Sequence, residues 1–69
     1  MDKGAHIRDL AVGDRVRPMN GHASPPWGRV LERDEAGRAV TVRLEEDGRL
    51  VRWPWGAEAK GHVWVAREA

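Results

Sequence analysis

The chain has 69 residues, and its 12 basic and 11 acidic side chains leave a net charge of +1. So short a chain forms one domain with a thin core, because it buries only about 60% of its unfolded surface. The absence of cysteine excludes a disulfide framework and a thiolate metal site, and the balanced charge favours a folded domain over a disordered chain.

The N-terminal segment, residues 1–9, is polar and lacks a periodic apolar pattern. It predicts a flexible lead-in, from which Ile7 docks on a domain that spans residues 10–69. No stretch has the apolar length of a signal peptide or a membrane span, so we expect a cytoplasmic protein without a membrane partner. Ten arginines against two lysines are typical of chains encoded by GC-rich bacterial genomes.

The first expected strand, residues 14–17, follows a sharp turn at Gly13. A long loop then runs to about Trp27 and leads into a second strand over residues 28–34. Acidic side chains and a glycine in residues 34–37 predict a hairpin turn that contains a positive-φ position.

The clearest strand signal is the alternation of apolar and polar residues over 39–45. Val40, Val42 and Leu44 are expected to face one side of a sheet, and the residues between them the other. A turn at residues 46–48 then leads to a fourth strand.

The fourth strand is expected over residues 49–54, and a glycine-rich segment follows it. Residues 55–61 are too short for an α-helix and predict a single 3₁₀ turn. Residues 62–66 alternate again and predict a last strand that pairs back to residues 14–17. The expected fold is all-β, with five strands that close on themselves and so remove exposed edges.

This order of strands, long loop, meander and 3₁₀ turn resembles the SH3-like barrel over residues 10–66. The Gly-Asp-Arg-Val opening at 13–16, followed by Gly-Arg-Val at 28–30, is similar to KOW and Tudor-like barrels and to the plasmid-encoded type II dihydrofolate reductases. The segment Trp-Pro-Trp-Gly-Ala-Glu-Ala-Lys at 53–60 resembles the end of the Mind-bomb type of SH3-like domain, with Ala59 in place of a family glycine. That family binds protein ligands in ubiquitin-ligase assemblies.

The reductase resemblance implies a small enzyme that builds one pore from four identical chains. The family's Val-Gln-Ile-Tyr motif falls opposite residues 50–53, which read Leu-Val-Arg-Trp and lack both the glutamine and the tyrosine. An oligomeric small-barrel enzyme or enzyme subunit is therefore the most distant functional alternative. We expect no catalytic residue, cofactor or metal, since no metal-ligand spacing relates the three histidines, His6, His22 and His62.

Tryptophan supplies all the aromatic residues except histidine, with four copies and no Phe or Tyr. Alternation places Trp53 and Trp55 on one side of the sheet, and Trp27 arrives there from the long loop. These rings, with Glu58 adding charge, predict a groove on a non-catalytic module that binds a protein or peptide. The competing interpretation is that Trp27 and Trp53 cap the two ends of the core.

Arginines on the expected strands suggest a second function, a nucleic-acid-binding barrel of the KOW or Tudor kind. Lined up across one face they would meet phosphates while Trp rings stack on bases. The residues concerned are Arg15, Arg17, Arg29, Arg43 and Arg52. Acidic neighbours interleave with them, and cross-strand neutralising pairs are the competing interpretation.

Overall fold

The computed structural model describes residues 3–19 and 26–68. Within these ranges six antiparallel strands form one sheet in the order β1-β6-β2-β3-β4-β5, and no helix has the length and hydropathy needed to traverse a bilayer. The strands are β1 (Lys3–His6), β2 (Arg15–Pro18), β3 (Gly28–Asp34), β4 (Ala39–Leu44), β5 (Leu50–Pro54) and β6 (Trp64–Arg67). Two 3₁₀ turns, η1 (Ile7–Asp9) and η2 (Ala57–Ala59), accompany them.

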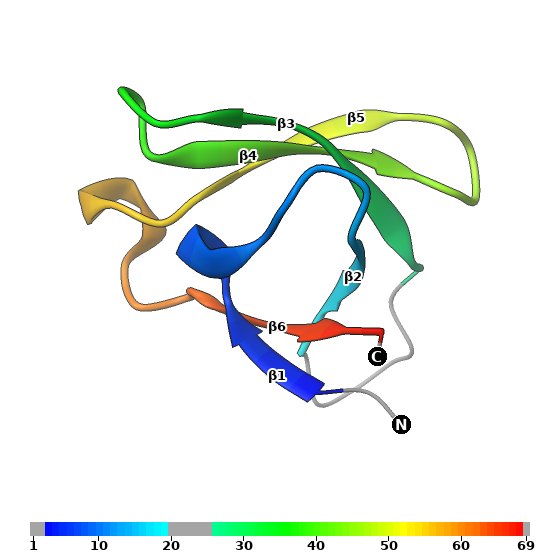
Figure 1. Ribbon diagram of the computed structural model, residues 1–69, viewed down its shortest axis with the longest axis horizontal. Helices are drawn as coiled ribbons and strands as arrows, with labels where there is room; N and C mark the ends of the chain where they lie inside the picture. The colour runs from blue at the N-terminus through cyan, green and yellow to red at the C-terminus, as the bar shows by residue number, and fades with distance from the viewer. Residues whose placement is uncertain (1–2, 20–25, 69) are drawn as a thin grey trace.

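The expected all-β architecture is confirmed, as is the 3₁₀ turn before the last strand. Strands β2 to β5 follow one another as neighbours in the sheet, and β6 returns to pair with β2, Arg17 lying opposite Ala66. In Figure 1, β3, β4 and β5 run across the top of the molecule while β1 and β6 lie side by side at the bottom. Residues 20–25 of the expected long loop, including His22, lie outside the described residues.

The strand count is six rather than the expected five, because the N-terminal segment supplies β1. This strand pairs with β6 over four positions, with Ala5 opposite Val65. Ala5 is buried, and Ile7 and Leu10, which follow it, are core residues. A strand of four residues gives too short an alternation to be recognised in the sequence.

The core forms on the inner face of the sheet, where β-branched side chains alternate with polar ones. On β4, Val40 and Val42 are 1% and 0% exposed. Arg43, which follows Val42 and points to the opposite face, is open to solvent, as the alternation predicts. Val40 and Val42 pack with buried residues of β2, β3, η1 and β6. Three half-buried side chains cover this cluster: Val51, Trp53 and Trp55.

The β3–β4 hairpin contains a positive-φ residue, but it is Arg38 (φ 53°) rather than the glycine. Gly37 donates its N–H to the Asp34 carboxylate at 2.9 Å, and a side chain at this position would collide with that carboxylate. A side chain at residue 37 would displace the ends of the Asp34 and Arg52 side chains, and Arg38 carries the left-handed conformation.

Candidate functional site

A cavity among the described residues lies where the end of β5, the start of β6 and the end of β2 meet. It has a volume of about 350 Å³. Its lining is mostly apolar and comes from segments distant in the sequence: Ile7, Pro18, Met19, Trp53, Pro54, Gly61, His62, Trp64 and Val65. We call this cavity the groove.

Two large apolar side chains of the groove remain open to solvent. Met19 is 59% exposed and Trp64 is 61% exposed. The Trp64 ring is held by an edge-to-face contact with His6, their centroids 5.4 Å apart and their planes at 73°. His6 is itself fixed, because its Nδ1 accepts the Arg8 N–H at 3.2 Å. The groove thus has an exposed but positioned aromatic wall.

Trp53 is the one expected ligand residue that lines the groove. It lies on β5 opposite Val40 and packs against the core. Its strand neighbour Pro54 lines the groove as well.

Trp27 lies at the other end of the molecule from Trp53. Its carbonyl accepts the Glu45 N–H at 3.0 Å, just beyond the C-terminal end of β4, whereas Trp53 pairs near the N-terminal end of that strand. The six residues of β4 extend over about 17 Å at a strand's usual rise. Trp27 and Trp53 are therefore not brought together, because alternation sets the face of a side chain and not its position along the sheet.

Arginine side chains cover the other two tryptophans of the expected site. The Arg15 and Arg17 guanidinium carbons each lie 4.6 Å from the Trp27 ring centroid. The Arg33 guanidinium carbon lies 5.0 Å from the centroid of the Trp55 ring. These are cation–π contacts within the protein, so both rings already have partners.

Glu58 lies outside the groove. Its carboxylate accepts a hydrogen bond from Arg52 Nη1 at 3.1 Å, and it borders a smaller cavity of about 180 Å³ beside the β3–β4 hairpin. It therefore acts as an ion-pair partner of a strand arginine, and of the four expected ligand residues only Trp53 reaches the groove.

Sequence reasoning missed the exposed walls of the groove. The alternation of the last strand carried a signal for Trp64, since it places this ring on the face opposite the buried Val65. Met19 had no such signal, because it reaches the groove only through the pairing of β2 with β6.

Three of the expected nucleic-acid residues form a row across the sheet. Arg15 pairs with Arg29, and Arg29 pairs with Arg43, on three adjacent strands. Among the described residues no carboxylate lies within 4.0 Å of the Arg29 or Arg43 guanidinium.

Carboxylates pair with two of the expected nucleic-acid residues, Arg15 and Arg52. Arg15 binds Glu45 through two hydrogen bonds, from Nε at 2.9 Å and from Nη2 at 3.0 Å, and it also binds Glu68. Arg52 binds Glu58 and lies 4.0 Å from Asp34. The structure therefore contains both the arginine row and the neutralising pairs that the sequence left as alternatives.

The Arg15 ion pairs shift the titration of their members. Hydrogen bonds from Arg15 hold the pKa of the Glu45 carboxyl below its ordinary value, and those to Glu45 and Glu68 raise the pKa of Arg15. Both groups are therefore charged at neutral pH, and the ion pair can form there.

No protein-family model, curated protein or solved structure matches this chain.

Proposed function

We propose that the six-stranded sheet is an SH3-like barrel that acts as a non-catalytic binding module and recognises a protein or peptide in the groove. The meander from β2 to β5, the 3₁₀ turn η2 and the return of β6 onto β2 support this fold assignment. The observation that carries the function is the apolar groove of about 350 Å³ with Met19 and Trp64 exposed on its walls.

The exposure of these walls favours a macromolecular ligand over a small molecule. A small-molecule site encloses most of its ligand's surface, whereas Met19 and Trp64 are each open to solvent over about three-fifths of their area. Exposed apolar side chains that share one patch are typical of protein-binding surfaces. A peptide or protein partner would cover both side chains and insert a side chain between them.

The nucleic-acid alternative is supported by the arginine row, but less strongly. The row begins at Arg15, which Glu45 and Glu68 neutralise. The Trp27 ring, which would stack on a base, is covered by the guanidinium groups of Arg15 and Arg17. Binding of a generic oligonucleotide that weakens steeply with salt would favour this alternative.

Selection of a phage-displayed library of random peptides tests the proposed function. We expect selected peptides to bind Met19→Ala and Trp64→Ala at least tenfold more weakly, since truncating the centre of an interface costs about 1.4 kcal/mol or more. The matched control is Val12→Ala, because Val12 is 62% exposed but lies outside the groove. Failure to select any peptide, or equal losses in the three variants, would overturn the proposal.

A further inference from the structure

β5 is an edge strand, with β4 on one side and no neighbour on the other among the described residues. The ladder between β4 and β5 is bounded by two hydrogen bonds of 2.8 Å, from Leu44 N–H to the Arg49 carbonyl and from Trp55 N–H to the Arg38 carbonyl. Hydrogen-bonded and non-hydrogen-bonded pairs alternate along an antiparallel ladder. The backbone groups of residues 51 and 53 therefore face β4, and those of residues 50, 52 and 54 face away.

This outer edge carries two N–H donors and three carbonyl acceptors. Leu50 and Arg52 supply both kinds of group, and Pro54 supplies a carbonyl only. A proline is tolerated at residue 54 because its nitrogen faces away from the sheet. Within the described residues no backbone hydrogen bond from outside the ladder reaches Leu50 or Arg52. The edge is thus available to the backbone of another strand.

The groove lies beside the C-terminal end of this edge. Trp53, on the inner face of β5, forms part of its wall together with Pro54. A strand added along β5 would place every second side chain on the same face as Val51 and Trp53, which is the side of the groove. These inward positions require apolar side chains.

The other side chains of an added strand would lie on the outer face of the sheet, which is basic beside β5. Arg43 lies directly opposite Leu50 and has no carboxylate within 4.0 Å among the described residues. Arg29, on β3, is the next residue of the same row and also has no carboxylate within 4.0 Å among the described residues. Charge complementarity therefore requires acidic side chains at the outward positions.

From these observations we infer that the partner is an extended peptide segment with alternating apolar and acidic residues, which adds to the free edge of β5 as a further strand. The inference rests on the proposed function and specifies its ligand. Backbone hydrogen bonds to Leu50 and Arg52 hold the segment, and its apolar side chains enter the groove past Trp53.

Amide hydrogen exchange, measured by NMR, tests the pairing directly. The probe is a short synthetic peptide of alternating glutamate and isoleucine, and the control peptide has the same composition in blocks. We expect the alternating peptide to slow exchange of the Leu50 and Arg52 amides at least tenfold. The Val51 and Trp53 amides, already bonded to β4, serve as internal controls and change less. The block peptide, and a peptide with lysine in place of glutamate, bind at least tenfold more weakly.

A backbone variant provides the second test. Leu50→Pro removes an outward N–H without removing a hydrogen bond to β4. We therefore expect the alternating peptide to bind this variant at least tenfold more weakly than the unaltered protein. The Val12→Ala variant should bind the peptide as tightly as the unaltered protein does. Circular dichroism checks that the proline variant folds, and the exchange measurement on the unaltered protein decides the question if it does not.

The outcomes separate the two proposals. Shifts of Met19 and Trp64 resonances without protection of Leu50 and Arg52 would overturn strand addition and leave groove binding intact. Absence of binding by the alternating peptide would also overturn strand addition, whereas groove binding stands or falls with the peptide selection.

Discussion

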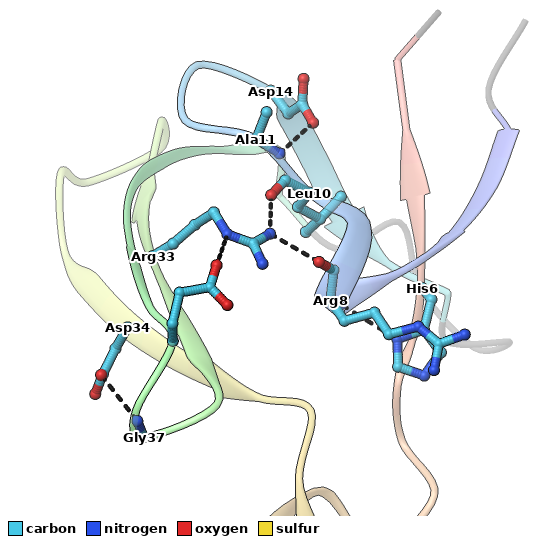
Figure 2. Close-up of polar contacts among 9 residues, drawn as sticks. His6, Arg8, Leu10, Ala11, Asp14, Arg33, Asp34 and Gly37 are labelled. Atoms are coloured by element: carbon cyan, nitrogen blue, oxygen red, sulfur yellow. Dashed lines mark hydrogen bonds and ion pairs between the residues drawn. The ribbon is translucent and has the colours of Figure 1, made fainter.

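Arg33 connects three parts of the molecule through one side chain. Its Nη1 donates to the Arg8 carbonyl at 2.8 Å and to the Leu10 carbonyl, and its Nε donates to Glu35 at 2.7 Å (Figure 2). The same guanidinium lies over the Trp55 ring. A planar group with several donors can make all these contacts, whereas a lysine ammonium cannot. Arg33 therefore fixes the segment around η1 against β3.

Replacing Arg33 by lysine should lower the free energy of unfolding by about 1–2 kcal/mol, because carbonyl partners lose their donor and the ring contact is weakened. Urea denaturation measures the change. Arg49→Lys is the control, since Arg49 is an exposed arginine and surface substitutions usually alter stability by less than about 0.5 kcal/mol. Equal effects of the two substitutions would contradict the role of Arg33.

At the scale of elements, Gly28 allows the first residue of β3 to approach β4 closely. It is a buried residue opposite Leu44. A Cβ atom built on it would lie 2.5 Å from Val42 Cγ1 and 3.1 Å from the Arg43 carbonyl oxygen. The absence of a side chain thus allows the start of β3 to pack on the core face of β4.

Gly28→Ala should destabilise the fold by about 1–3 kcal/mol, since the added methyl group overpacks a core valine and a backbone carbonyl that is held in the sheet. The urea midpoint reports the loss. Gly4→Ala on β1 is the matched control and should be nearly neutral, because the nearest atom to its added Cβ is Met19 Sδ at 3.6 Å. A neutral Gly28→Ala variant would show that β3 and β4 can separate at this point.

At the scale of the whole molecule, Arg15 joins segments that are far apart in the sequence. From β2 it binds Glu45, which follows β4, and Glu68, which follows β6. In the sheet, β1 and β6 lie on one side of β2, and β3, β4 and β5 lie on the other. The two ion pairs of Arg15 therefore connect both sides of the sheet to β2.

The Glu45 link predicts a loss of stability in acid. The pKa of Glu45 is lower in the folded protein than its ordinary value of 4.5, so its contribution is present above that value and is lost as the pH falls through the folded pKa. The unaltered protein should be more stable than Glu45→Gln at pH 7, and the two should converge in acid. Urea midpoints over this pH range measure the effect, with Glu46→Gln as the control. A difference that does not depend on pH would exclude the ion pair as its cause.

The strands with a long alternation were predictable, and the short N-terminal strand was not. Residues 39–45 carry three inward side chains in register, a pattern that predicts both a strand and its buried face. Among residues 4–6 of β1 only Ala5 is buried, so the local pattern does not predict the pairing of β1 with β6. The left-handed φ of Arg38 was not predictable either, because the neighbouring Gly37 is the residue type that favours this conformation.

Local sequence patterns were enough to predict the all-β class, the faces of the main strands and the 3₁₀ turn, since each depends on residues that are neighbours along the chain. They did not predict which tryptophans meet, because that depends on how distant strands pair. Trp27 lies one β4 length away from Trp53, and the groove combines Trp53 with Met19 and Trp64 from two other strand ends. The physical reason is that register between strands distant in sequence places side chains along the sheet, and local periodicity contains no measure of that register.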